Sequence, residues 1–366
     1  MKTKSVFLLL ILLAFAGHAP AQSSAKHRRD SLRALHNKQD TNYVRKYPDR
    51  LIITLYQSTR QYDVRFSQTL LEDTGALSKH QYMADANLVT GAAIDLDKIS
   101  VSFSLKSRPS TPADVKKKGR TNYGSFSLSF NAYRFRVETS YRKYQGFYDL
   151  NSPRYISSFN DTTPYFHSPM NVLSLRAKTL FIFNKRRFSY NAAYSNTYRQ
   201  VKSAGSWLGA ANVYWYGFSS DTSLFPMASR FYYDRWGYLN RFNMLGISLG
   251  PGASYNLVLF KLLYLNLTLT AGLDMQHQAF FTDVYGNTLK RWRPGFASDF
   301  RAALGFNSRN FFISLVNRID YNSYAGPGFV IEPRFISGEF NIGYRFPLKK
   351  RKWMIKVQEN KWYKKL

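Results

Sequence analysis

The sequence predicts an all-β fold: an antiparallel transmembrane β-barrel of the outer-membrane type, with about 12 strands and a range of about 10–14. Three observations predict it. Apolar and polar residues alternate along many segments, these segments are long, and Tyr, Trp and Phe residues crowd their ends. Segments of about 9–13 residues match a tilted membrane crossing, whereas a globular strand usually has about 5–6.

Strict alternation gives each strand one apolar and one polar face, because successive side chains point to opposite sides. In residues 126–130 phenylalanine and leucine alternate with serine, and in residues 265–269 leucine alternates with asparagine and threonine. Residues 51–69 could add a further pair of strands. In chain order, we expect strands at residues 86–95, 99–106, 123–131, 133–143, 171–182, 188–200, 206–217, 242–256, 262–275, 295–306, 311–319 and 335–346.

The polar faces carry charged residues, among them Arg136 and Glu138 in one predicted strand and Arg176 and Lys178 in the next. A dry sandwich core could not hold these groups, because an unpaired buried charge is very costly. The lumen of a membrane barrel can hold them. A soluble sheet that exposes its polar faces to solvent is the alternative interpretation.

Composition narrows the class of protein further. The 366 residues include 52 Lys+Arg against 22 Asp+Glu, for a formal net charge of +30, and there is no Cys. A disulfide scaffold, an iron–sulfur protein and a cysteine-based zinc site are therefore excluded. With 45 % hydrophobic residues, the chain has enough apolar surface to form a large core or a lipid-facing wall.

The N-terminus has the features of a secretory signal peptide at residues 1–21. Lys2 and Lys4 precede an apolar region at residues 6–16, and Ala19-Pro20-Ala21 provides small residues for cleavage. No later stretch has the 18 uninterrupted apolar residues that a membrane helix needs. These features predict a protein of the outer membrane of a Gram-negative bacterium. The predicted organisation is a signal peptide at 1–21, a basic periplasmic lead-in at 22–50, the β-barrel at 51–346 and a basic C-terminal tail at 347–366.

Several short motifs resemble one family. These are Asp40-Thr41-Asn42-Tyr43, Asn184-Lys185-Arg186-Arg187-Phe188-Ser189-Tyr190, residues 200–209 and Gly250-Pro251-Gly252. Together they are similar to the domain of unknown function 4421 family of Bacteroides-type Gram-negative bacteria, over residues 40–346. The resemblance implies a secreted outer-membrane-type β-barrel without an assigned activity. It supplies no catalytic residues to carry over to this chain.

Candidate catalytic chemistry is sparse. The histidines after the signal peptide lack metal-ligand spacing, and there is no Gly-x-Ser-x-Gly motif. Asp274 and His277 are three residues apart and would fall on opposite faces of a strand. Ser195 has no histidine at an activating spacing, although a triad can assemble across strands. We therefore predict no catalytic residues, cofactor or metal, and an outer-membrane lipid-modifying enzyme is kept as an alternative.

A set of charged residues on the polar faces is the main candidate site. Arg134, Arg136 and Arg142 share one face of a predicted strand with the counter-charge Glu138. Arg176 and Lys178 share a face of the next strand, so adjacent strands would form a basic ladder in the lumen. A wide lumen would then be an anion pore. A narrow barrel would instead be plugged, with the cations paired to carboxylates, and we favour this outcome because small barrels fill their lumen with side chains.

Basic clusters at residues 116–120 and 349–352 are suited to polyanions. The signal peptide argues against a nucleic-acid partner, so the expected partners are outer-membrane lipid and lipopolysaccharide. The alternating segment Gly338–Phe346 resembles the terminal strand that outer-membrane assembly machinery recognises. We predict a structural, transport or interaction role. A soluble secreted β-protein that binds polyanions is a second alternative, and the oligomeric state is open.

Overall fold

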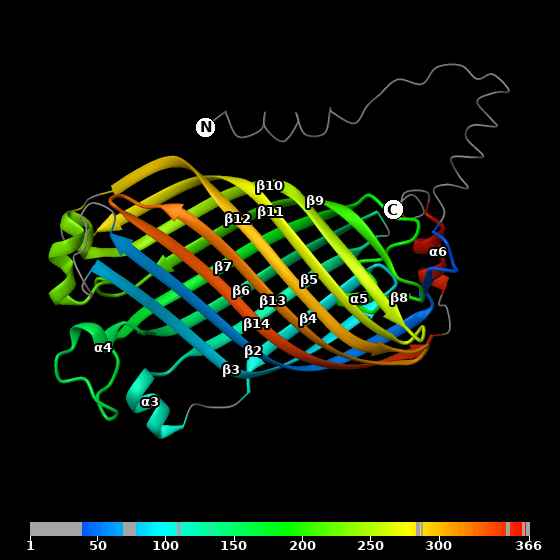
Figure 1. Cartoon of the computed structure of the whole chain (residues 1–366), viewed down its shortest axis with the longest axis horizontal. Coiled ribbons are helices and arrows are strands. Elements are labelled where there is room, and N and C mark those ends of the chain that lie inside the picture. Colours follow the sequence, from blue (N-terminus) through cyan, green and yellow to red (C-terminus); the bar gives the residue numbers. More distant parts are fainter. Residues whose placement is uncertain are drawn as a thin grey trace, which may run out of the picture. The chain divides into compact units, whose positions relative to one another are not determined.

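Alternating side chains allow the strands to close on themselves, with one face of each strand outside and the other inside. Twelve antiparallel strands form one closed barrel, in which the last strand pairs with the first (Figure 1). The fold class predicted from the sequence is therefore confirmed. The computed structural model describes residues 39–68, 78–107, 111–132, 134–282, 286, 288–348, 352–360 and 363.

The predicted signal peptide at 1–21 lies outside the described residues, as do residues 22–38 of the predicted lead-in and residues 349–351 of the predicted tail. No helix in the described ranges is long and apolar enough to cross a membrane. The barrel strands are β2 (Arg50–Gln68), β3 (Lys79–Leu96), β4 (Ile99–Lys106), β5 (Asn122–Asn131), β6 (Phe135–Asp149), β7 (His167–Ile182), β9 (Ala204–Ser219), β10 (Leu239–Leu259), β11 (Leu263–Thr282), β12 (Thr288–Asn307), β13 (Phe311–Ala325) and β14 (Phe329–Pro347).

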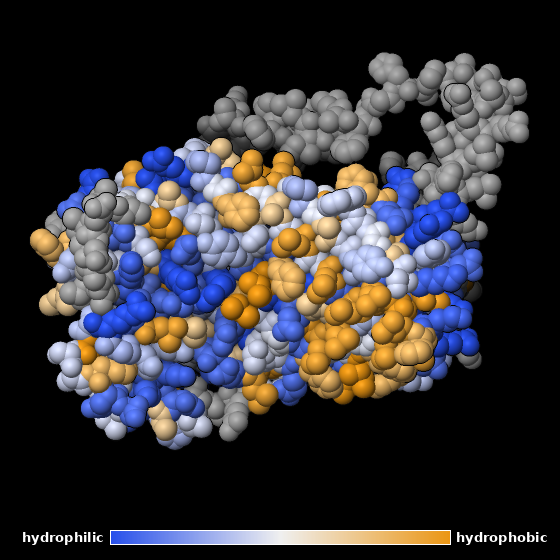
Figure 2. All heavy atoms as spheres, viewed as in Figure 1, coloured by the Kyte–Doolittle hydropathy of each residue, from blue (hydrophilic) through white to orange (hydrophobic). Residues whose placement is uncertain are grey.

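The outer wall of the barrel is apolar. On β11, Leu267 and Leu269 are 48 % and 55 % exposed, whereas Thr268 between them is buried inside. The neighbouring strand β10 repeats this pattern with Ile247 and Leu249 outside. Figure 2 shows a patch of such side chains on the wall towards the end where helix α6 (Lys352–Glu359) lies. A wall of this composition is the one that membrane barrels present to lipid.

Close contacts between aromatic rings and glycines tie some neighbouring strands together. Tyr56 of β2 is directly opposite Gly91 of β3, and a Cβ at Gly91 would overlap the tyrosine ring. Tyr214 of β9 covers Gly246 of β10 in the same way. An aromatic ring that covers a cross-strand glycine compensates for the missing side chain and helps to fix the register.

The two ends of the barrel differ in their connections (Figure 1). At the turn end, strands are joined by short turns such as 97–98 and 308–310, and β2 begins and β14 ends there. At the loop end, longer connections carry helix α3 (Pro112–Lys118), helix α4 (Ser152–Tyr155) and the 3-10 segment η2 (Met227–Tyr238). In bacterial barrels, short turns face the periplasm and longer loops face the exterior.

The predicted strand at 188–200 is wrong. The connection between β7 and β9, residues 183–203, folds into the lumen from the turn end, and we name it the plug. It contains helix α5 (Asn191–Tyr194) and strand β8 (Tyr198–Gln200), which pairs with β1 (Val44–Lys46) in a separate sheet. Apolar residues alternate in this segment as they do in a strand, which is why it was predicted as one. Residues 188–193 are nevertheless all buried, so the segment has no outward face as a barrel strand has. β2 takes the missing place in the barrel, as one long strand rather than the further pair considered for residues 51–69.

Candidate functional site in the lumen

The lumen is filled in three layers. The aromatic layer lies towards the loop end, the charged layer lies in the middle, and the plug lies at the turn end. The aromatic layer consists of the rings Tyr62, Phe66, Tyr82, Tyr123, Tyr144, Phe147, Tyr214, Tyr216, Phe218, Phe225, Tyr233, Trp236, Phe242, Phe280, Tyr324, Phe329 and Phe335. The charged layer consists of Arg60, Asp95, Arg136, Glu138, Arg142, Arg176, Lys178, Asp299, Arg301, Arg318, Asp320 and Glu339.

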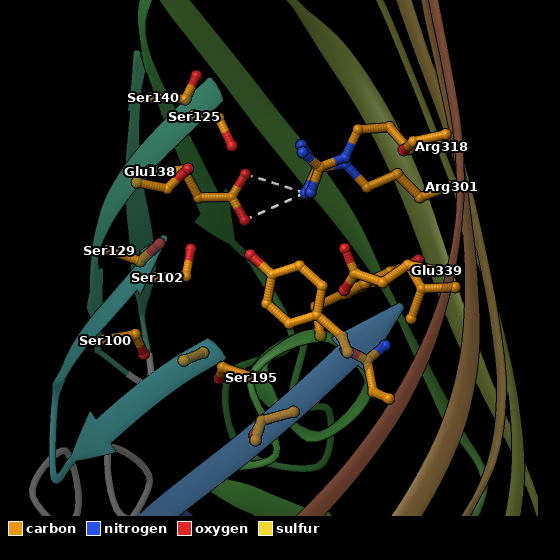
Figure 3. Close-up of a pocket in the computed structure, with 18 of the residues that line it drawn as sticks. Ser100, Ser102, Ser125, Ser129, Glu138, Ser140, Ser195, Arg301, Arg318 and Glu339 are labelled. Atoms are coloured by element: carbon orange, nitrogen blue, oxygen red, sulfur yellow. Dashed lines mark hydrogen bonds and ion pairs between the residues drawn. The ribbon is translucent and has the colours of Figure 1, made fainter. Parts of the chain in front are cut away.

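Arg301 is the centre of the charged layer, and only 1 % of it is exposed. Its Nε lies 3.0 Å from Asp299 Oδ1 on the same strand, and its Nη1 lies 2.9 Å from Glu138 Oε2. Nη1 also donates to the hydroxyl of Tyr190 in the plug at 2.9 Å. Arg301 is on β12 and Glu138 is on β6, and Figure 3 shows their ion pair across the cavity. Through Tyr190, the same guanidinium also contacts the plug.

Two aspartates extend the charged layer across the lumen. Lys178 Nζ lies 3.1 Å from Asp299 Oδ1, and Arg176 Nη1 lies 2.9 Å from Asp320 Oδ2. Arg142 Nη1 approaches the same Asp320 oxygen at 3.5 Å. The cations come from β6 and β7, and the aspartates from β12 and β13. These ion pairs cross the lumen, whereas the ladder hydrogen bonds of the same strands run to their neighbours in the barrel wall.

The structure brings most of the predicted cluster together. Arg136, Glu138, Arg142, Arg176 and Lys178 all line one interior cavity. Arg136 is bound to Glu138 through an ion pair of 2.6 Å.

Arg134 is the exception within the predicted cluster. It lies in the turn before β6 begins at Phe135, at the turn end of the barrel, and does not line the cavity. The predicted strand began at residue 133, so alternation placed Arg134 on the same face as Arg136. The strand begins only at Phe135, and alternation does not apply before it.

The carboxylates that balance the cluster were not among the predicted site residues. Asp299 and Asp320 are directly opposite each other on β12 and β13, and so are Arg301 and Arg318. In the sequence, each strand carries its acid and its arginine two residues apart, which places both on one face. This spacing is the signal that could have identified them. Which strands face each other across the lumen is not encoded in such a local pattern.

The cavity has a volume of about 150 Å³. Serine hydroxyls of β4, β5 and β6 line one side, and the guanidinium groups of Arg301 and Arg318 lie on the other (Figure 3). Seven cations of the charged layer stand against five carboxylates of the same layer. The cations are Arg60, Arg136, Arg142, Arg176, Lys178, Arg301 and Arg318, and the carboxylates are Asp95, Glu138, Asp299, Asp320 and Glu339.

The plug is fastened to the turn end by Arg345 of β14, which is fully buried. Its Nε and Nη2 donate to the carbonyl oxygen of Asn196 at 3.0 and 2.8 Å, and Nη2 also donates to Asn307 Oδ1 at 2.7 Å. In the plug, the hydroxyl of Tyr194 donates to Asn266 Oδ1 of β11 at 2.6 Å. These contacts hold the plug against both β11 and β14.

The aromatic layer is closed by the connection between β9 and β10, which carries η2. Phe225 of this connection stacks on Tyr233 with a ring-centroid distance of 3.9 Å and is fully buried. The hydroxyl of Tyr233 donates to the carbonyl oxygen of Ser78 at 2.8 Å, and that of Tyr82 donates to the carbonyl oxygen of Leu224 at 2.5 Å. The connection is therefore packed into the mouth of the barrel.

A His–Asp pair lies at the loop end. His80 Nδ1 lies 2.6 Å from Asp149 Oδ2, and both side chains are fully buried. Tyr155 of α4 donates to the same carboxylate at 3.0 Å, and burial together with Asp149 raises the pKa of Tyr155. The nearby Ser152 hydroxyl donates to the carbonyl oxygen of Asp149 at 2.6 Å. In this arrangement Asp149 orders the loops, and Ser152 is bonded to backbone rather than to His80.

The other candidates from the sequence lie apart from one another. Ser195 is in the plug, where its hydroxyl donates to the carbonyl oxygen of Asn191 at 3.2 Å and contacts the hydroxyl of Thr197 at 3.0 Å. On β11, Asp274 faces the lumen and binds Tyr214, whereas His277 contacts the outer Trp292. Among the described residues, no group of three or more His, Asp or Glu side chains could hold a metal ion.

The fold and the lumen define a class of protein: a closed β-barrel whose interior is filled by its own side chains and an internal plug. The chain belongs to the family described as Domain of unknown function (DUF4421), whose model matches residues 38–346. The family resemblance inferred from the short motifs is thereby confirmed. No curated protein matches the chain.

Solved structures with a similar trace include outer-membrane barrels. The outer membrane protease OmpT of Escherichia coli has 8 % identity and a TM-score of 0.39, and the match covers 82 % of this chain and 98 % of that chain. Neisserial surface protein A has 9 % identity and a TM-score of 0.23, with 80 % and 97 % covered. The toluene transporter TodX of Pseudomonas putida has 7 % identity and a TM-score of 0.28, with 82 % and 90 % covered.

Proposed function

We propose that this protein is an outer-membrane β-barrel that does not conduct and that acts through the surfaces its loops present, in a structural or interaction role. The observation that carries the proposal is the charged layer, in which Arg301 and Glu138 connect distant walls of the lumen. The aromatic layer lies on one side of it and the plug lies on the other. A solute crossing the barrel would have to displace all three layers.

The membrane part of the proposal is supported by the apolar outer wall and by the lengths of the strands. β10 and β11 have 21 and 20 residues, which is more than the about 9–11 residues that a tilted strand needs to cross a bilayer. The charged side chains of the middle layer lie inside, and leucines such as Leu249 lie outside. A soluble β-protein has its apolar side chains inside and its charged side chains outside, so this reversed distribution argues for lipid around the barrel.

Single-channel recording tests whether the lumen is closed. Purified full-length protein in planar lipid bilayers is expected to give no stable conductance, because ion pairs such as Arg301–Glu138 occupy the cross-section. Steady anion-selective channels that are lost in the Arg136→Glu variant would overturn the proposal and establish the alternative, an anion pore. The bilayers are validated beforehand with a known porin.

The partner that the loop end fits is an anionic glycolipid such as lipopolysaccharide. Helix α3 places Lys116, Lys117 and Lys118 in its last turn at the loop end, and Arg120 follows in an exposed position. In outer-membrane barrels this end faces the surface of the cell. Basic side chains near an anionic lipid surface contribute about 1 kcal/mol each.

Replacing two of these lysines tests the partner. The Lys116→Gln/Lys117→Gln variant is expected to bind lipopolysaccharide about 30-fold more weakly in a titration in nonionic detergent, because about 2 kcal/mol of attraction is lost. The matched control is Lys261→Gln/Arg309→Gln, which removes two exposed cations from the turn end. An equal loss of affinity in both variants would argue against a partner specific to the loop end.

A further inference from the structure

We propose that the cavity of the charged layer binds one small oxyanion of the phosphate or sulfate type, held between Arg318 and the serine hydroxyls of β4, β5 and β6. The site is separate from the loop surface of the proposed function. Oxyanion binding can be measured whether or not the lumen conducts ions. The result of that measurement therefore does not depend on the result of single-channel recording.

The first argument is charge. The charged layer carries an excess of two formal positive charges over the five carboxylates of the same layer. An unbalanced charge inside a barrel surrounded by lipid is expensive, because water is scarce there and ions are strongly stabilised by water. A bound anion removes this cost. The position of the excess therefore indicates where an anion would be held.

The second argument is the position of Arg318. It is directly opposite Arg301 on the neighbouring strand, and like charges in this arrangement repel each other. Both oxygens of Glu138 lie within 3.1 Å of Arg301 Nη1, and Arg136 Nε lies 2.6 Å from one of them, so Glu138 is already shared by two arginines. Arg318 takes part in none of the ion pairs among the described residues, and its Nε has no hydrogen-bond partner there. Its guanidinium lines the cavity and lacks a counter-charge of its own.

The third argument is the opposite wall. Ser102, Ser127 and Ser140 form a row across β4, β5 and β6, because Ser127 is the register partner of both of the others. All three line the cavity, and Figure 3 shows the labelled serines of this wall across from Arg318 and Arg301. Hydroxyls can donate hydrogen bonds to an anion, and a row of them supplies several donors without adding charge. Glu138 of β6 lies beside Ser140 on this wall, but both of its oxygens are bound to Arg301. The hydroxyls therefore remain as the neutral donors of this wall that a compact anion can use.

The chemistry and the size select the class of anion. A guanidinium presents paired N–H donors that match two oxygens of a phosphate or sulfate group, which a chloride ion cannot use. The cavity volume of about 150 Å³ is about ten times the ~10–15 Å³ that one water requires, so an oxyanion fits with a few waters. A long anionic chain does not fit between the aromatic layer and the plug.

The experiment measures thermal unfolding of the full-length barrel in nonionic detergent, followed by the mobility shift between folded and unfolded protein on gels. The protein is refolded in chloride buffer without oxyanions and titrated with sodium sulfate or sodium phosphate at constant ionic strength. We expect a saturable rise of several degrees in the unfolding midpoint at millimolar oxyanion. In Arg318→Gln, the half-saturating concentration is expected to rise at least 10-fold. The control variant Arg309→Gln removes an exposed arginine of the β12–β13 turn and is expected to behave like the unmodified protein.

The outcomes distinguish the site from general salt effects. A midpoint that rises equally in chloride, or equally in Arg318→Gln and the unmodified protein, would overturn the proposal. Ser127→Ala provides an independent test on the opposite wall, in case Arg318→Gln does not fold. It is expected to weaken the oxyanion effect by about 5–10-fold, because one hydrogen bond to a charged group is lost, and an unchanged titration in this variant would also overturn the proposal.

Discussion

Replacing Arg301 with methionine is expected to lower the free energy of unfolding by about 3–5 kcal/mol. The substitution removes the cation that binds both Asp299 and Glu138, and it leaves two buried carboxylates with fewer partners. It also removes the hydrogen bond to Tyr190 in the plug, so the middle layer and the plug both lose a contact. Equilibrium unfolding by guanidinium in phospholipid vesicles measures the change.

The control for this prediction is Arg309→Met, at an exposed position in the turn after β12. It is expected to change the free energy of unfolding by less than about 0.5 kcal/mol. The double variant Arg301→Met/Glu138→Gln is expected to be more stable than the sum of the single changes implies, because the carboxylate that has lost Arg301 is then removed as well. Simple additivity would show that the ion pair across the lumen contributes nothing to stability.

Replacing Phe225 with alanine is expected to detach the connection between β9 and β10 from the mouth of the barrel. Phe225 is fully buried and packs on Tyr233, Phe66 and Phe329. Losing such a ring costs about 3–5 kcal/mol. Because this cost falls mainly on the local packing, we expect trypsin cleavage in the η2 segment to become about 100-fold faster or more while the barrel remains folded.

The same segment offers a matched control. Phe231 lies six residues further along, and 88 % of it is exposed, so Phe231→Ala is expected to leave the cleavage rate within about twofold. Rates are measured on gels that separate the folded barrel from the cleaved product. If Phe225→Ala is cleaved no faster than Phe231→Ala, the aromatic layer does not hold this connection in place.

The barrel could be predicted from the sequence because alternation is a local signal. Along much of β10 and β11, every second residue lies on the outer wall and the others face the lumen, so the pattern marks both strands clearly. The predicted ends of these strands were less accurate, because β11 continues to Thr282, beyond the predicted end at 275. Near the loop end the inner face turns from polar to aromatic, and the contrast between the two faces fades there. Residues such as Phe280 therefore did not appear to belong to a strand.

The plug and the centre of the charged layer could not be predicted in this way. Tyr190 and Phe188 alternate with smaller residues as a strand would, yet their surroundings are set by contacts with β6, β7 and β12. The pairing of Arg301 with Glu138 joins residues 163 positions apart in the chain. Alternation assigns each side chain to a face, but it does not specify which side chains meet across a closed lumen.

The seam between β14 and β2 affects the rates at which the barrel folds and unfolds. Arg50 pairs with Pro347, so the barrel cannot close until almost its whole length is in place. Contacts between residues so distant in sequence slow folding, because the entropy of loop closure must be overcome before they form. In the reverse direction, separating this seam would expose the ion pairs of the lumen to lipid before other strands are freed. We therefore expect the lifetime of the folded protein to be set by the height of this unfolding barrier rather than by its equilibrium stability.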